Sequence, residues 1–218
     1  MKVKNLIRAV LFDMDGTLLD SETLSERATN YGFKEILGRE VTAEEHSQLI
    51  GRPVKKILAQ WFPDKGETIY DTGRMYFMSR LSTVETYPGI SKVLETLSKN
   101  YSIGVVTSSH RSDAQNLLTI SGLLAYVRLY VGQEDTEYQK PDPEPLNLAL
   151  KRLGVSSDEA VFVGDQPYDI IAAHEAGMPA GAALWGSGNP ERLEMYHPDS
   201  LLKRPEDIFD FIGKLESQ

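Results

Sequence analysis

Apolar residues along the chain occur in two kinds of segment: short continuous runs, and longer stretches in which they recur every three or four positions. The short runs are typical of strands buried on both faces of a parallel sheet. We expect strands over residues 8–12, 101–106, 129–131, 160–163 and 180–184, and helices over 90–99, 113–121, 145–153 and 170–176. Because strands and helices alternate, the pattern predicts a doubly wound, Rossmann-like parallel sheet of the α/β class.

Residues 21–86 interrupt this alternation directly after the first expected strand. Their pattern is helical with almost no strand signal, and glycines and prolines separate the helical stretches. We expect these helices over 23–37, 43–50, 54–62 and 67–81. The chain should therefore fold as a core domain of residues 1–20 and 87–218, with a small all-α cap domain of residues 21–86 inserted into it.

Two aspartates, Asp13 and Asp15, follow the first expected strand and are followed directly by Gly16. In open parallel sheets, ligands bind at the carboxyl ends of the strands. On an extended backbone the two side chains would point to the same side, so the carboxylates should repel unless a cation or a proton separates them. An ordinary acidic turn at a strand end is the alternative for this segment taken alone.

Three later segments also place polar residues beside expected strands. They are Thr107 and Ser108 after the run 102–106, Lys140 before a Pro-Asp-Pro sequence, and Asp165 with Asp169 after the run 160–164. The prolines after Lys140 should start a helix and hold the lysine in one place. Carboxylates alone would repel a phosphate dianion, whereas carboxylates around a hard divalent cation such as Mg²⁺, beside a lysine, would bind it.

In this order the four segments resemble the motifs of the haloacid dehalogenase superfamily of phosphohydrolases. The resemblance extends from about Arg8 to Leu202 and is strongest to the helical-capped small-molecule phosphatases, a group that includes phosphoglycolate phosphatases, pyrophosphatases and sugar-phosphate mutases of the β-phosphoglucomutase type. It implies a haloacid dehalogenase-like core, Mg²⁺ as cofactor, and hydrolysis of a small phosphorylated metabolite through an aspartyl-phosphate.

Each candidate residue then has a chemical role. Asp13 would attack phosphorus, Asp15 would act as general acid and then as general base, and Lys140 would neutralise charge. Thr107 and Ser108 would bind phosphate oxygens. The candidate metal ligands are Asp13, Asp15, Asp165 and Asp169, of which Asp169 could act directly, through water, or by orienting Lys140.

Residues that would select the substrate are weaker candidates. Glu22 follows the first hinge, Arg52 lies at a turn of the cap, and His110 follows the second motif closely. Loops tend to carry specificity, so we expect the cap to distinguish one metabolite from another. The sequence Gly186-Ser-Gly-Asn lacks the lysine and the full glycine pattern of a phosphate loop, so we expect a tight turn there.

Two other functions stay open. A sugar-phosphate mutase would share the acid at Asp15, but the resemblance implies a cap histidine shortly after the first motif, and residues 20–25 contain none. A catalytically idle relative that binds phosphorylated ligands would usually lose the nucleophile, the acid or a metal ligand. The resemblance implies that enzymes similar to the dehalogenases lack an acid at the position of Asp15. The acid here therefore favours phosphoester or phosphoanhydride cleavage over carbon–halogen or carbon–phosphorus cleavage, and a hydrolase is the preferred interpretation.

Composition excludes further kinds of partner and of chemistry. The 218 residues carry a net charge of −9, which argues against nucleic acid or an anionic membrane as a partner. The chain has no cysteine, so disulfides, thiolate catalysis and cysteine–metal sites are excluded. It shows no signal peptide and no run long enough to span a bilayer, so we expect a cytoplasmic protein that is a monomer or a weak dimer.

Overall fold

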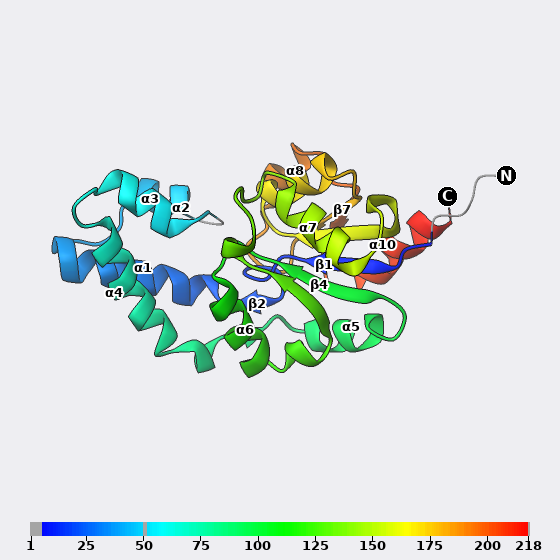
Figure 1. Ribbon diagram of the computed structural model, residues 1–218, viewed down its shortest axis with the longest axis horizontal. Helices are drawn as coiled ribbons and strands as arrows, with labels where there is room; N and C mark the ends of the chain where they lie inside the picture. Colours follow the sequence, from blue (N-terminus) through cyan, green and yellow to red (C-terminus); the bar gives the residue numbers. More distant parts are fainter. Residues whose placement is uncertain (1–5, 50–51, 218) are drawn as a thin grey trace. The chain divides into compact units, whose positions relative to one another are not determined.

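The computed structural model describes residues 6–49 and 52–217 (Figure 1). The chain divides into two compact units, one formed by Met1–Asp20 with Thr86–Gln218 and the other by Ser21–Glu85. The first unit contains a six-stranded sheet in the order β5-β4-β1-β6-β7-β8, and its strand pairs are parallel. The predicted doubly wound α/β fold is therefore confirmed.

The strands of this sheet are β1 (Ala9–Phe12), β4 (Ser102–Val106), β5 (Val127–Val131), β6 (Ala160–Gly164), β7 (Ala180–Ala183) and β8 (Ser200–Leu202). The residues of β1 and β6 are all buried, as expected for central strands covered on both faces. The sequence analysis assigned no strand at Ser200–Leu202, because three residues are too few to show a period.

Helices cover both faces of the sheet. They are α5 (Ile90–Leu97), α6 (Arg111–Ile120), α7 (Glu144–Leu153), α8 (Pro167–Glu175), α9 (Pro190–Glu194) and α10 (Asp207–Glu216), with short 3₁₀ turns at Leu123–Ala125, Gln133–Asp135 and Ser157–Glu159. Helices α5 and α6 lie on one face, and α7 and α8 lie on the other (Figure 1). Buried side chains of α7 and α8, such as Leu146 and Ile170, pack with Leu11 and Phe162 of the strands. Burial of each such side chain stabilises the fold by about 1.5–3 kcal/mol.

The register of the three central strands brings their carboxyl ends to one level. Phe12 at the end of β1 is aligned with Val105 of β4 and with Val163 of β6. The residues that follow the three strands therefore leave the sheet at the same edge. This register is the structural reason why segments far apart in the sequence can form one site.

The second unit is helical. It comprises α1 (Glu22–Leu37), α2 (Ala43–Leu49), α3 (Val54–Trp61), α4 (Gly66–Met78) and a 3₁₀ turn at Leu81–Thr83. The unit has a hydrophobic core of its own, formed by Phe33, Leu49, Ile57, Leu58 and Ile69. Of the expected helix over 43–50, residue Ile50 lies outside the described part of the chain. Short strands β2 (Leu19–Asp20) and β3 (Glu85–Thr86) pair at the two ends of the insertion.

Helix α2 begins with a capping box. The backbone N–H of Thr42 donates to Oε2 of Glu45 at 2.9 Å, and the backbone N–H of Glu45 donates to Oγ1 of Thr42 at 3.2 Å. Arg39 adds two further hydrogen bonds to the Glu45 carboxylate, at 2.7 and 2.8 Å. These bonds hold the pKa of Glu45 at about 2, chiefly through Arg39. The connection from α1 to α2 is therefore fixed by polar contacts as well as by packing.

Over the described residues, we find no helix with the length and apolar character needed to cross a bilayer.

Candidate active site

Three buried carboxylates meet at the edge where β1 and β6 end. Asp13 follows β1, Asp165 follows β6, and Asp169 lies in the first turn of α8. Each offers a carboxylate oxygen, and these oxygens lie within 4.8 Å of one another. Asp165 and Asp169 are each only 1% exposed, and Asp13 is 7% exposed. Carboxylates so close and so well shielded from water are costly unless positive charge balances them.

Lys140 supplies part of that charge. Its Nζ donates to Oδ1 of Asp13 at 2.8 Å, to Oδ1 of Asp169 at 2.7 Å, and to the backbone oxygen of Val106 at 3.1 Å. An ammonium group has three hydrogen atoms to donate, so these three bonds use its full capacity. The lysine is held in one place beside Asp13, in agreement with the expectation from the following prolines, and α7 begins directly after Pro143.

The electrostatic surroundings raise the pKa of Asp13 well above its ordinary value. Burial is the largest cause, and the carboxylates of Asp169, Asp165 and Asp15 add to it, while Lys140 opposes it. For Lys140, burial acts to lower the pKa of the ammonium, but the attraction of Asp13 and Asp169 outweighs burial and raises that pKa above its ordinary value. Lys140 is therefore charged at neutral pH, and the carboxylate group around it remains short of positive charge.

The donor set suits a hard divalent cation. Asp13, Asp165 and Asp169 present carboxylate oxygens only, and Mg²⁺ prefers oxygen ligands and is typically held by one or two carboxylates. Lys140 provides one positive charge against three carboxylates, so a dication would complete the balance. Oδ2 of Asp169 accepts the backbone N–H of Gln166, the residue that caps the amino terminus of α8, at 3.0 Å. Asp169 thus contacts both Lys140 and the start of α8, whereas Asp165 follows β6 directly.

The carboxylate of Asp15 accepts hydrogen bonds from residues outside the group of three carboxylates. Its Oδ2 accepts hydrogen bonds from Oγ of Ser109 at 2.8 Å and from Oγ1 of Thr107 at 3.2 Å. The extended backbone does not continue past Asp13, because the chain turns at Met14, whose carbonyl oxygen accepts the N–H groups of residues 18 and 19. The assignment of the Asp15 carboxylate as a metal ligand stays a prediction, since the group of clustered oxygens does not include it.

The second motif lies at the carboxyl end of β4. Thr107 is 2% exposed, and its Oγ1 accepts the backbone N–H of Ser109 at 3.0 Å. Ser108 is half-buried between them, and His110 stands at the amino terminus of α6 with Nδ1 paired to a carboxylate oxygen of Glu134. The strand end thus presents hydroxyl and N–H groups at the same edge of the sheet as Asp13.

The other two predicted substrate residues belong to the helical unit. Glu22 is the first residue of α1 and is half-buried. Arg52 is exposed between α2 and α3, and its Nη1 donates to the backbone oxygen of Gln48 at 3.4 Å. Their assignment to substrate binding stays a prediction.

Four polar residues that the sequence analysis did not assign to the site contact its carboxylates. They are Thr17, Ser109, Gln166 and Ser187. Three of them donate to Asp165: Thr17 Oγ1 to Oδ1 at 2.8 Å, and Gln166 Nε2 and Ser187 Oγ to Oδ2 at 2.7 and 2.6 Å. Thr17, Ser109 and Gln166 stand next to recognised motif residues, so their position in the sequence was a usable signal. Ser187 had no such signal.

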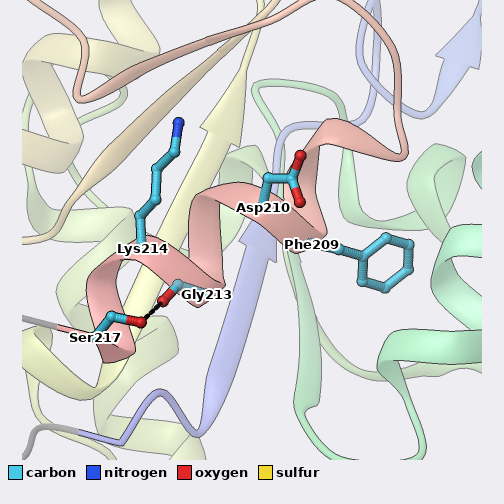
Figure 2. A pocket seen from close by; sticks show the side chains of 5 residues that line it. All are labelled: Phe209, Asp210, Gly213, Lys214 and Ser217. Atoms are coloured by element: carbon cyan, nitrogen blue, oxygen red, sulfur yellow. Dashed lines mark hydrogen bonds between the residues drawn. The ribbon is translucent and has the colours of Figure 1, made fainter.

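A shallow hollow on the surface of α10 offers no comparable chemistry. Figure 2 shows its five lining residues, which are Phe209, Asp210, Gly213, Lys214 and Ser217. The hydroxyl of Ser217 there donates to the backbone oxygen of Gly213 at 2.6 Å. The hollow includes none of the residues at the strand ends, so the candidate active site is the carboxylate group around Lys140.

Comparison with known proteins agrees with this geometry. The sequence profile described as "Haloacid dehalogenase-like hydrolase" matches residues 10–183, a span that contains Asp13, Thr107, Lys140, Asp165 and Asp169. The chain belongs to the haloacid dehalogenase-like hydrolases. It is therefore an enzyme of the hydrolase type, as the motifs predicted.

Within the haloacid dehalogenase-like hydrolases, the chain is similar over nearly all of its length to several relatives. A Clostridium perfringens protein named "Putative pyrophosphatase PpaX" is 33% identical over 214 residues, which are 97% of this chain and 100% of that protein. A solved haloacid dehalogenase-like hydrolase from Streptococcus pneumoniae is 26% identical, with a TM-score of 0.83 over 94% of this chain and 98% of its own. A Thermotoga maritima structure titled "putative beta-phosphoglucomutase" is also 26% identical, with a TM-score of 0.76 over 95% and 99% of the two chains.

Proposed function

We propose that this chain is a Mg²⁺-dependent phosphatase that hydrolyses a small phosphorylated metabolite through a phosphoryl group carried by Asp13. The observation that supports the proposal most strongly is the position of Asp13. Its carboxylate follows a central strand, accepts a 2.8 Å hydrogen bond from a buried lysine, and lies within 4.8 Å of two more carboxylates. Positioning and charge neutralisation are the main contributions that an enzyme makes to phosphoryl transfer.

In the first step, a carboxylate oxygen of Asp13 forms a bond to phosphorus while the bond from phosphorus to the leaving oxygen breaks. Lys140 holds the attacking carboxylate in place through its 2.8 Å hydrogen bond and adds positive charge beside the transferring group. Thr107 and Ser108, at the end of β4, would bind oxygens of that group. The leaving oxygen needs a proton, and Asp15 is the acid that would supply it.

In the second step, water attacks phosphorus and the bond between phosphorus and Asp13 breaks, so the carboxylate is regenerated and phosphate is released. Asp15, deprotonated in the first step, would accept the proton that the water loses. The hydroxyls of Thr107 and Ser109 hold Oδ2 of Asp15 at 3.2 and 2.8 Å. They would keep its carboxylate in one orientation through both proton transfers.

Asp13 and Asp165 would hold the cation, with Asp169 as a third ligand or as the partner of Lys140. When bound, Mg²⁺ would neutralise the charge of the phosphate oxygens. The raised pKa of Asp13 supports this assignment, because burial and the neighbouring carboxylates disfavour its ionised form more than Lys140 favours it. A cation that favours the ionised form of Asp13 would also favour the form that attacks phosphorus.

Inorganic pyrophosphate is the first substrate to test. The relative named as a pyrophosphatase matches this chain at 33% identity over all of its own length. Phosphate release should be measured from pyrophosphate, phosphoglycolate, a hexose phosphate and p-nitrophenyl phosphate, with Mg²⁺ and with chelator. We expect Mg²⁺-dependent release by the wild type and none by Asp13→Asn. Equal release by both proteins, or none from any compound with any divalent metal, would contradict the proposal.

A sugar-phosphate mutase is the second candidate, favoured by the similarity to the Thermotoga maritima structure. The sequence between Asp15 and His46 contains no histidine, which counts against this function. The two activities differ in their product. A hydrolase releases phosphate in proportion to substrate consumed, whereas a mutase returns an isomeric sugar phosphate, so quantitative phosphate release from a hexose phosphate would exclude the mutase.

A further inference from the structure

The segment after β7, residues 185–188, packs closely against the loop that carries the first motif. Trp185 Nε1 donates to the backbone oxygen of Thr17 at 2.8 Å. A Cβ atom on Gly186 would lie 2.0 Å from the backbone oxygen of Gly16, so no side chain fits at this position. From the sequence we expect only a tight turn in this segment. Its contacts place it beside the loop that follows Asp13.

Ser187 in this segment closes a hydrogen-bonded triangle on Asp165. Its Oγ lies 2.6 Å from Oδ2 of Asp165, and Gln166 Nε2 donates to that same oxygen at 2.7 Å and to Ser187 Oγ at 3.0 Å. Thr17 Oγ1 donates to the other oxygen, Oδ1, at 2.8 Å. Neighbouring side chains therefore donate hydrogen bonds to both oxygens of the Asp165 carboxylate.

These contacts oppose a repulsion. The carboxylates of Asp13 and Asp169 lie within 4.8 Å of Asp165, and like charges at that distance would push the Asp165 side chain out of the group. Rotation about one side-chain bond would suffice. Donors to both oxygens of Asp165 stabilise the orientation in which one of these oxygens lies within 4.8 Å of an oxygen of each of the other two carboxylates. A cation shared by the three carboxylates requires this orientation.

We propose that Ser187, together with Gln166, is a positioning residue for Asp165 and thereby sets the affinity of the site for a divalent cation. The inference rests on the proposed function, because it assumes that Asp165 is a cation ligand. Ser187 contacts Asp165 and Gln166, and its proposed effect on the cation is transmitted through Asp165. Outer hydrogen-bond partners of metal ligands typically change metal affinity by about 10–100-fold when they are removed.

The test is a calorimetric titration of the metal-free protein with Mg²⁺ or Mn²⁺ alone, with no substrate. Ser187→Ala should weaken binding about tenfold or more, and Ser187→Thr, which keeps the hydroxyl, should restore it. Ser98→Ala is the matched control, since Ser98 is an exposed serine of the same unit, as Ser187 is. The Oγ of Ser98 donates to the backbone oxygen of Glu95 at 3.0 Å and not to a carboxylate of the site. This control should bind as the wild type does.

The variant Asp165→Ala distinguishes a failure of the positioning role of Ser187 from a failure of the proposed cation site. If Asp165→Ala loses binding while Ser187→Ala binds as tightly as the wild type, the role of Ser187 is overturned and the cation site stands. If Asp165→Ala binds as the wild type does, the cation site itself is wrong. Ser187 is exposed, so its hydroxyl can be removed without opening a cavity in the core. Gln166→Met removes the second donor, and unchanged affinity in both variants would also overturn the inference.

Discussion

Nζ of Lys140 lies 2.8 Å from Oδ1 of Asp13, although 127 residues separate the two in the sequence. The same Nζ lies 2.7 Å from Oδ1 of Asp169, so Asp169 acts on Asp13 through the lysine. One ammonium therefore joins the ends of three segments: the strand β1, the loop before α7, and the first turn of α8.

Removing this ammonium should destabilise the protein. In Lys140→Met the side chain keeps much of its volume, but Asp13 and Asp169 lose their shared partner. Loss of one member of a buried ion pair typically costs about 3–5 kcal/mol of unfolding free energy. Urea unfolding at pH 7 in chelator measures it, and Lys151→Met, on α7 in the same unit, is the control. An unchanged unfolding free energy in Lys140→Met would show that the pair does not stabilise the fold.

The raised pKa of Asp13 predicts a stability that depends on pH. The folded state holds the proton of Asp13 above the ordinary pKa of 3.8, so ionisation of this group costs stability as the pH rises from about 4 through the raised value. Asp13→Asn mimics the neutral form. In chelator, the variant should gain stability relative to the wild type as the pH is raised to 7, and a difference independent of pH would contradict the assignment.

Mg²⁺ should offset this cost in the wild type. A ligand present at one hundred times its Kd adds about 2.7 kcal/mol to the unfolding free energy. The gain should be largest at neutral pH and should decrease toward pH 4, because protons compete with the cation for the carboxylates. Thermal unfolding with and without Mg²⁺ at several pH values measures it. An equal shift in wild type and in Asp165→Ala would mean that the cation binds elsewhere.

Glu45→Gln should weaken the helical unit. Glu45 closes the capping box of α2 and accepts two hydrogen bonds from Arg39, and its pKa is lowered from 4.5 to about 2. A depressed carboxyl pKa contributes stability above the unfolded-state value, and this stability is lost as the pH falls from about 4.5 toward 2. At pH 7 we expect a loss of about 1 kcal/mol, since the group is partly exposed.

A matched variant tests the origin of that effect. Glu67→Gln removes an exposed ion pair with Lys55 on α3 but no helix cap, so it should change stability less than Glu45→Gln does. Thermal unfolding of both variants at pH 7 and pH 3 gives the comparison. Equal losses, or a loss that grows as the pH falls, would show that the capping box is not the cause.

Arg52→Ala tests the expectation that the helical unit selects the substrate. Residues at the strand ends would contact the phosphoryl group and the cation, and these are the same for every candidate substrate. If Arg52 binds the distal part of the true substrate, its removal should lower kcat/KM for that substrate by about 1–3 kcal/mol and leave p-nitrophenyl phosphate almost unaffected. Equal effects on both compounds, or no effect on either, would show that Arg52 is an exposed residue that does not bind the distal part of the substrate.

The sequence predicted those features whose signal is local. Asp13 and Asp165 end apolar strands, and Lys140 precedes prolines that start a helix, so each residue carries its own context. Helix α10 was not assigned, although Ile208, Phe211 and Ile212 have helical spacing and are buried. The spacing of these apolar residues is itself a local signal for this helix.

Other features depend on contacts that no local pattern shows. Ser187 lies 22 residues beyond Asp165 in an exposed bend, and only the parallel register of β6 and β7 brings the two together. Ser109 could be placed beside Thr107 from the sequence, but its bond to Asp15 requires the chain to turn at Met14. The contact of Ser187 with Asp165 and that of Ser109 with Asp15 therefore depend on long-range contacts that a local sequence pattern does not show.

The central claim is that Asp13 carries the phosphoryl group during turnover, and rapid acid quenching during the first turnover tests it most directly. The quenched protein is digested, and its peptides are analysed by mass spectrometry with and without hydroxylamine, which cleaves acyl phosphates. The account predicts one hydroxylamine-sensitive phosphoryl group on the peptide that contains Asp13, and none in Asp13→Asn. Turnover at the normal rate without this group on Asp13, together with activity retained in Asp13→Asn free of deamidation, would contradict it.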